Sequence, residues 1–291
     1  MSTLLQILLR SLETGAIYAL ATLGIIIVFR TNLMINFAQG VMGMFGAYIV
    51  TVLYTKANMP LLAAIALGVI IAIGLGFVVD IVVIRRTKRV AGTGKEIITL
   101  GMMMVFLGIT PMIFGVDPMR LPKVIETGEI AIGGANLSYN SLLNIVVGIG
   151  LTVALFMILQ KTKLGLAIRT TASSEKTARL MGVPTKWVTL FAWALALVLG
   201  TLAGTMIAPS TSVTVNLMDN VQVNAFIACV LGGFQTFYGP VLGAYIIAIA
   251  TNLLSYYVSS VWGAQILYAL VIIFIVIKPV GLIGKRVTKK V

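Results

Sequence analysis

The sequence predicts an all-α polytopic membrane protein with about eight transmembrane helices, a short re-entrant helix and a short cytoplasmic helix. The first observation is composition: the 291 residues are 59% hydrophobic and 10% charged, with a mean hydropathy of +1.08. The second is length, because several apolar runs reach the roughly 20 residues that cross a bilayer core. The third is that basic residues gather in short segments between those runs. We therefore expect a single membrane domain over residues 1–291.

Polar or glycine-rich segments delimit the apolar runs. The first run lacks a small-residue cleavage site, which predicts a retained helix and not a removed signal peptide. A stretch at about 224–238 is short and ends in a Gly-rich run, so we expect a re-entrant segment buried among other helices, because lipid cannot satisfy its backbone. The expected spans are about 11–29, 36–55, 61–84, 96–115, 140–160, 187–208, 240–258 and 262–278.

Charge predicts the orientation of the spans. Basic residues cluster at 85–89, 161–186 and 278–290, and the positive-inside rule makes all three clusters cytoplasmic. The loops 116–139 and 209–223 carry no basic excess and are expected outside. Counting back from these loops places the N-terminus outside as well. The net charge of +13 thus reflects topology, and we expect no nucleic-acid partner.

Several residue types that catalysis or cofactor binding needs are missing. The sequence contains no histidine, which excludes His-based metal sites, Ser–His catalysis and His proton relays. Its single cysteine, Cys229, lies in an apolar stretch. The run 92–96, GTGKE, lacks the spacing of a phosphate loop and has Glu96 where Ser or Thr should hold magnesium, so we interpret it as a flexible cytoplasmic turn. We expect no enzyme activity and no cofactor on this chain.

The longest charged interruption, about 164–186, predicts a short amphipathic helix from about Thr171 to Met181. Thr171 or Ser173 can cap its start, and Gly182 followed by Pro184 can end it. Such a helix on the cytoplasmic side is typical of a docking element that inserts into another protein. We call it the coupling helix. Its candidate contact residues, with Ala178, Leu180 and Met181 as exposed apolar groups, are Glu175, Ala178, Arg179, Leu180, Met181 and Gly182.

Two polar breaks in the apolar sequence suggest a pathway through the membrane. An uncharged polar lining suits a zwitterion, and interrupted helices commonly border substrate routes. The alternative is hydrogen bonding between helices. The candidate pathway residues are Asn36, Gln39 and Gly40 in the first break, and Gly232, Gly233, Gln235 and Thr236 in the second.

Glycine spacing indicates close helix contacts at Gly200 and Gly204, at Gly239 and Gly243, and at Gly40, Gly43 and Gly46. These contacts either pack the chain internally or form a subunit interface or a pathway wall. The runs GMFGAYI at 43–49 and GPVLGAYI at 239–246 also resemble each other, which is consistent with an internal repeat.

Four blocks resemble the permease subunits of bacterial branched-chain amino-acid ABC importers, in particular the shorter of the two paired permeases. They extend over nearly the whole chain in the expected order. The family pattern usually has a histidine where this chain has Gln39. The blocks are GAIYAL at 15–20 with INFAQG at 35–40, LG at 164–165 through ARLMGV at 178–183, LGG at 231–233 with YGPVLGA at 238–244, and KPVGLIGK at 278–285.

The resemblance implies a non-catalytic subunit of the bacterial cytoplasmic (inner) membrane that passes branched-chain or similar hydrophobic amino acids inward by alternating access. It implies as partners a second homologous permease, two ATPase subunits that bind ATP and magnesium, and an external solute-binding protein. The substrate stays open, since related members serve urea, short amides or other amino acids. A secondary ion-coupled transporter is the competing class, and an intramembrane enzyme lacks the residues it would need.

Overall fold

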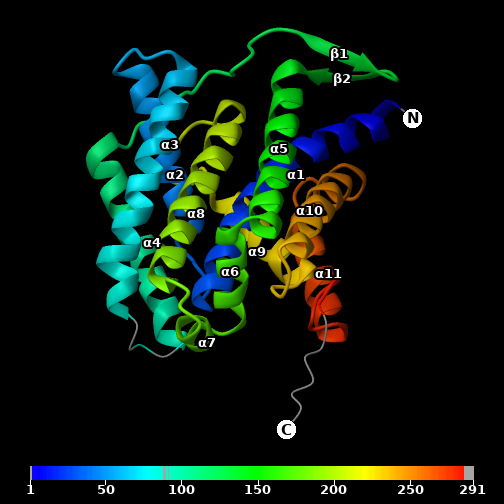
Figure 1. Cartoon of the computed structure of the whole chain (residues 1–291). Helices are drawn as coiled ribbons and strands as arrows, with labels where there is room; N and C mark the ends of the chain where they lie inside the picture. Colours follow the sequence, from blue (N-terminus) through cyan, green and yellow to red (C-terminus); the bar gives the residue numbers. More distant parts are fainter. Residues whose placement is uncertain (1, 88–89, 91, 285–291) are drawn as a thin grey trace.

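A computed structural model describes residues 2–87, 90 and 92–284 as a helical bundle with one small hairpin (Figure 1). Short irregular turns, η1 (Val79–Val83), η2 (Ile84–Thr87) and η3 (Ala208–Ser210), extend two of the helices. The α-helices are α1 (Ser2–Asn32), α2 (Gln39–Thr55), α3 (Leu61–Val78), α4 (Gly92–Phe114), α5 (Tyr139–Lys161), α6 (Lys163–Ser173), α7 (Glu175–Leu180), α8 (Thr185–Ile207), α9 (Asp219–Gly232), α10 (Tyr238–Tyr257) and α11 (Gly263–Ile277).

Within these described residues, six helices are long and apolar enough to cross a membrane, namely α1, α3, α4, α5, α8 and α10. All eight predicted spans coincide with a helix. Two of those helices, α2 with 17 residues and α11 with 15, are shorter than the other six. The chain is thus a multi-pass helical membrane protein.

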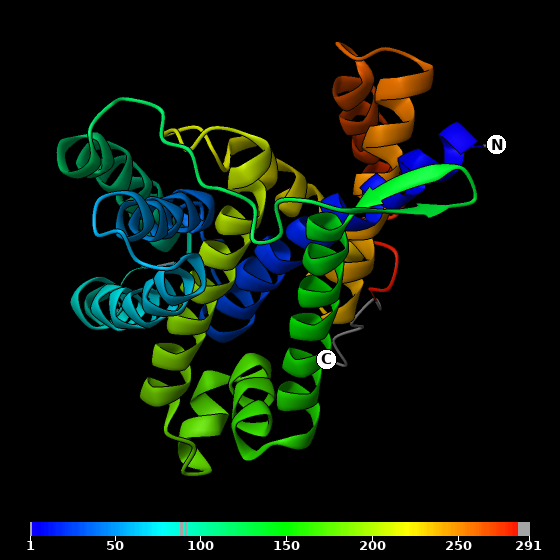
Figure 2. The same ribbon diagram turned by 90° about the horizontal axis from the view of Figure 1, so that it is seen from above.

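Helix α1 runs obliquely through the middle of the bundle (Figure 2) and packs against α5, α8, α9 and α10. Most of its residues between Ala16 and Val28 are fully buried. It also carries polar contacts to its neighbours: the Asn252 Nδ2 of α10 donates to Ser11 Oγ over 2.9 Å, and the Asn224 Nδ2 of α9 donates to the Tyr18 hydroxyl over 3.2 Å. Polar side chains in these spans therefore hold helices together.

Glycines bring α2 and α8 into backbone contact. A Cβ atom placed on Gly43 would lie 2.7 Å from the Gly200 carbonyl oxygen, and one placed on Gly204 would lie 2.9 Å from the Gly43 carbonyl oxygen. On α10, Gly239 and Gly243 approach the backbone of α9 in the same way. These predicted close contacts lie inside the chain, which supports the packing interpretation over a subunit interface.

The two ends of the bundle differ. Figure 1 shows the N-terminus, β1 (Glu129–Ile132) and β2 (Ala135–Ser138) at one end and α7 at the other. The antiparallel pair of β1 and β2 is an exception to the predicted all-α fold. Gly133 and Gly134 adopt the positive φ angles that its tight turn needs. The loops that the charge pattern predicts to be external meet at this end, where Met119 and Val213 exchange backbone hydrogen bonds of 3.1 and 2.8 Å.

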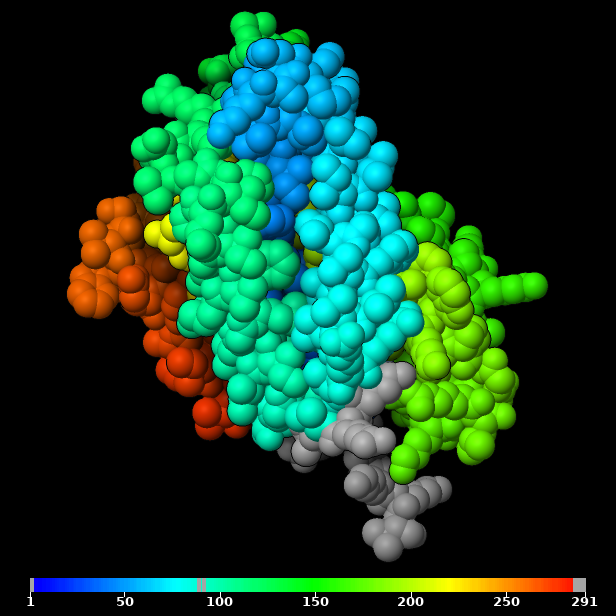
Figure 3. Space-filling view, turned by 90° about the vertical axis from the view of Figure 1, so that its left-hand side faces the viewer, coloured from blue at the N-terminus to red at the C-terminus, as the bar shows by residue number. Residues whose placement is uncertain are grey.

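Helices α3 and α4 form an outer layer, side by side on one face with α2 behind them (Figure 3). Helix α4 is mostly exposed, since only 17% of its most apolar 18-residue stretch is buried inside the molecule. The predicted flexible turn at 92–96 is wrong, because these residues form the first turn of α4. A glycine-rich start does not prevent a helix when a long apolar run follows it. Residues 88, 89 and 285–290 of the predicted basic clusters lie outside the described residues.

Candidate functional site

The charged stretch at about 164–186, where one coupling helix is predicted, forms two helices, α6 and α7. Thr162 Oγ1 caps α6 by accepting from Gly165 N over 3.1 Å, and Ser174 Oγ caps α7 by accepting from Thr177 N over 3.3 Å. The prediction that Thr171 or Ser173 starts the helix is therefore wrong. Ser174 has an extended backbone, with φ −163° and ψ 112°, and this bend separates the two helices. Thr171, Ser173 and Ser174 all carry hydroxyl groups near this bend, and the sequence alone does not show which of them caps the helix.

The end of α7 follows the prediction. Gly182 takes a φ of +78°, and the Val183 N–H donates to the Ala178 carbonyl over 2.9 Å, which closes the turn in a left-handed C-cap. Leu180 is 90% exposed and Met181 is 71% exposed, as an apolar contact surface requires. Ala178 was also predicted to be exposed, which is wrong, since it is 1% exposed. Its small side chain lets α7 pack closely against the bundle.

Polar contacts fasten α7 to α8. Arg179 pairs with Glu175 one turn earlier and donates through Nε to Thr185 Oγ1 over 3.0 Å. Thr185 is the first residue of α8 and is buried. Arg179 therefore connects α7 directly to the start of α8.

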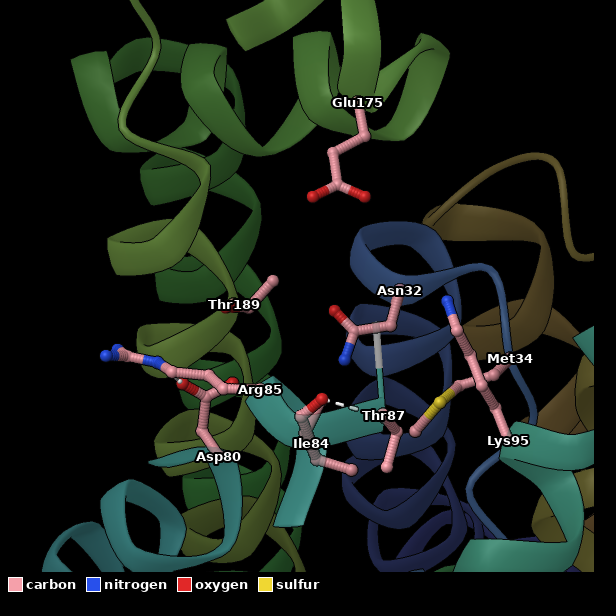
Figure 4. Close-up of a pocket in the computed structure, with 9 residues that line it drawn as sticks. All are labelled: Asn32, Met34, Asp80, Ile84, Arg85, Thr87, Lys95, Glu175 and Thr189. Carbon is pink, nitrogen blue, oxygen red and sulfur yellow. Dashed lines mark hydrogen bonds and ion pairs between the residues drawn. The ribbon is translucent and has the colours of Figure 1, made fainter. Parts of the chain in front are cut away.

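Glu175 also faces a small cavity of about 40 Å³ where the ends of several membrane helices meet (Figure 4). Its carboxylate points toward the amide of Asn32 at the end of α1, and Thr189 of α8 and Lys95 of α4 line the same space. Both amide atoms of Asn32 are buried without a hydrogen-bond partner. The cavity thus places a charged group of α7 opposite an unsatisfied polar group of α1.

The end of α3 that the charge pattern predicts to be cytoplasmic is fastened at the same junction. Arg85 Nε forms an ion pair with Asp80 Oδ2 over 2.8 Å, and Arg85 Nη2 donates to the Lys186 carbonyl over 3.3 Å. Asp80 is fully buried in the π-helical turn η1. Inserted turns of this kind are frequent at functional sites. Helices α1, α3, α4 and α8 therefore each have one end close to α7.

The first pathway group is buried and hydrogen-bonded. Asn36 Nδ2 donates to Gln39 Oε1 over 3.2 Å, and Gln39 Nε2 donates to the Ala196 carbonyl of α8 over 2.7 Å. Gly40 lies against Gln222 of α9, whose Nε2 donates to the Phe37 carbonyl over 3.2 Å. Sequence reasoning missed Gln222, although an amide in an apolar stretch was the available signal.

The second group has a different environment. The Gln235 carbonyl accepts from Arg30 at the end of α1, and Thr236 Oγ1 accepts from Gly239 N over 3.1 Å as a cap of α10. Gly232 lies against the backbone of Gly239. Gly233 has a φ of +92° and leaves no room for a side chain, because a Cβ there would be 2.7 Å from the Val280 carbonyl oxygen.

The two pathway groups contact different partners. The first faces α8 and α9, whereas the second faces the end of α1 and the segment after α11, where Leu282 N donates to the Leu231 carbonyl over 2.7 Å. The blocks at 231–244 and 278–284, far apart in sequence, thus lie together. Asn36, Gln39, Gly40, Gly232, Gly233, Gln235 and Thr236 remain predicted pathway residues, each with a packing role in this conformation.

Comparisons with known proteins match nearly the whole chain. The chain is 28% identical to a probable branched-chain amino acid transport permease protein LivH of Methanocaldococcus jannaschii, with 94% of this chain and 91% of the relative aligned. It is 27% identical to the high-affinity branched-chain amino acid transport system permease protein BraD of Pseudomonas aeruginosa, covering 99% and 98%. It is 26% identical to the corresponding LivH of Escherichia coli K12, covering 99% and 97%.

Residues 7–276 match the family described as the permease component of branched-chain amino acid transport systems. The match includes most of α1, every helix from α2 to α10 and nearly all of α11. The chain therefore belongs to the family of branched-chain amino acid transport permeases, which are non-catalytic membrane components of ABC transport systems.

Proposed function

We propose that this permease passes branched-chain or similar hydrophobic amino acids inward by alternating access, driven by ATP hydrolysis on partner subunits. The observation that carries the proposal is the pair Leu180 and Met181, two large apolar side chains exposed at the tip of a capped helix on the basic side of the bundle. Exposed apolar groups of this kind are typical of a docking surface. The ATPase is the partner that an importer needs on that side.

Movement of α7 would reach the membrane helices through three contacts. Arg179 connects α7 to Thr185 at the start of α8, and Ala178 is packed at the same boundary. Glu175 faces Asn32 across the small cavity. Helix α8 in turn packs on α1, α2 and α3, so a rigid displacement of α7 would spread through the bundle.

The complete transporter would contain a second homologous permease, two ATPase subunits carrying ATP and magnesium, and an external solute-binding protein. In this arrangement α2 and α11 are membrane helices as well, giving eight, while α9 enters from outside and α10 returns the chain to the outer face. The C-terminal end of α11, the start of α4 and α7 would then share the cytoplasmic face of a bacterial inner membrane.

The polar breaks would border the substrate route once the bundle changes conformation. In the present arrangement the Gln39 side chain is hydrogen-bonded to Asn36 and to the Ala196 carbonyl. The glutamine that stands in place of the usual histidine therefore still forms a hydrogen-bonded junction. No charged side chain is needed at this position for a zwitterion to pass.

The test is reconstitution. The permease, its neighbouring permease and the ATPase subunits would be placed in proteoliposomes with the binding protein, and uptake of labelled leucine would be measured with ATP and with a non-hydrolysable analogue. We expect uptake that requires hydrolysis and that competes with isoleucine and valine. Uptake that persists without ATPase subunits and depends on an ion gradient would refute the proposal in favour of a secondary transporter.

A further inference from the structure

A second cavity, of about 370 Å³, lies between the end of α1, α5, α6 and the segment before α10. Two arginines line it, Arg30 from α1 and Arg169 from α6, together with the polar residues Gln160 and Thr236. The lower ends of α1, α5 and α6 are seen together in Figure 1, at the same end of the molecule as α7. The cavity is about nine times larger than the one that Glu175 faces.

Arg30 has a guanidinium whose charge is not neutralised by a carboxylate. One of its Nη atoms donates to the Gln235 carbonyl, and its Cζ lies 5.3 Å from the centre of the Phe237 ring. Its Nε is buried and has no hydrogen-bond partner. Within the described residues no Asp or Glu forms an ion pair with Arg30 or lines this cavity. A buried donor on a cation without a counter-charge is costly, so an anion would be stabilised there.

Arg169 adds a second cation from the opposite wall. It is exposed, and its Nη2 donates to the Gln160 carbonyl over a long 3.4 Å. Guanidinium groups bind phosphate oxygens with paired N–H donors. The cavity also adjoins the first turn of α10, which is 20 residues long and has its positive dipole end there.

The remaining walls are apolar and lead to the membrane surface. Phe156 and Leu159 of α5 and Tyr238 of α10 line the cavity, and neighbouring side chains of α5, Met157 and Ile158, are exposed. Arg30 lies in the last turn of a helix that is long and apolar enough to span the bilayer. The cavity therefore lies at the depth where headgroups and acyl chains meet, on the side where positive residues attract anionic lipid.

We propose that this cavity binds the phosphate of an anionic phospholipid from the cytoplasmic leaflet. The phosphate would lie between Arg30 and Arg169 and accept from both, and the first carbons of the acyl chains would lie against Phe156 and Tyr238. Such a lipid would connect α6, which leads into α7, with the end of α1. The binding itself is independent of transport, so it can be tested whether or not the proposed function holds.

The experiment compares phosphatidylglycerol with phosphatidylcholine on the purified permease in detergent, by native mass spectrometry and by thermal unfolding. We expect phosphatidylglycerol to be retained and to raise the unfolding midpoint, and phosphatidylcholine to do neither. Each of Arg30→Gln and Arg169→Gln should weaken phosphatidylglycerol binding about tenfold, because each removes a charge-assisted contact. Arg120→Gln in the outer loop is the matched control and should bind as the wild type does.

Two outcomes would overturn the proposal. Unchanged phosphatidylglycerol binding in Arg169→Gln would remove the cavity as the site, and this variant keeps the fold testable because Arg169 is exposed. Equal stabilisation by glycerol 3-phosphate would instead show that the site takes a soluble phosphate and not a lipid. Retention of binding in Arg30→Lys together with its loss in Arg30→Gln would support the role of the charge.

Discussion

The exposed tip of α7 gives the sharpest test of coupling. Leu180→Asp replaces a side chain that is 90% exposed in this chain, so no cavity opens and the permease should fold as before. If Leu180 is buried in an ATPase groove, its transfer from water contributes about 1.5–3 kcal/mol. A central interface residue often costs about 2 kcal/mol or more on truncation. A loss of about 2 kcal/mol corresponds to roughly 30-fold weaker binding at 1.4 kcal/mol per tenfold.

The assay titrates purified ATPase subunits against tagged permease in nanodiscs and then measures substrate-stimulated ATP hydrolysis. Val116→Asp, in the loop at the opposite end and 80% exposed, is the matched control and should bind the ATPase normally. Ala178→Asp places a charge at a buried position and should instead destabilise α7. ATPase binding by Leu180→Asp within about twofold of the wild type would refute the role assigned to the tip, since the estimated loss is tenfold or more.

Three further predictions follow. A cysteine at Thr127 should react with an impermeant thiol reagent added outside intact cells, while one at Lys186, which is also exposed, should be protected; external labelling at Lys186 would reverse the proposed orientation. Gly43→Val should lower the unfolding midpoint and the recovery of folded permease, at a cost of about 1–3 kcal/mol, because its Cβ would meet the Gly200 carbonyl; a stability equal to wild type would contradict the close contact. Gln39→Trp should abolish leucine uptake while the assembled complex is recovered if Gln39 borders the route, whereas loss of assembly in the same preparation would leave only the packing role.

Features that depend on local patterns were predictable from the sequence. Apolar length located every long helix, and the positive φ of Gly182 followed from a glycine placed before Pro184. The ion pair of Asp80 with Arg85 joins residues five positions apart and is local in the same sense. In each case the residues that decide the structure lie within about two helical turns of each other, so the interaction can be inferred without the fold.

Features that depend on tertiary contact were not predictable. Ala178 is buried because the bundle lies above α7, and an alternation of polar and apolar residues in six positions does not show which face that is. The hairpin at 129–138 forms where Gln6 of α1 exchanges two hydrogen bonds with Asn136, of 2.8 and 2.7 Å, across 130 residues. The cavity between Arg30 and Arg169 likewise needs helices from both halves of the chain.

The central place of α1 has a consequence for synthesis. Gly15 of α1 packs on Tyr245 of α10, about 230 residues later in the chain. At roughly 5–20 residues per second, the ribosome needs on the order of 10–50 s to deliver that partner. During this interval Ser11 and Tyr18 lack the amides of Asn252 and Asn224 that they contact in the finished bundle. The first helix made is thus among the last to be completed, which makes α1 the segment that most needs the translocon or a membrane chaperone while it waits.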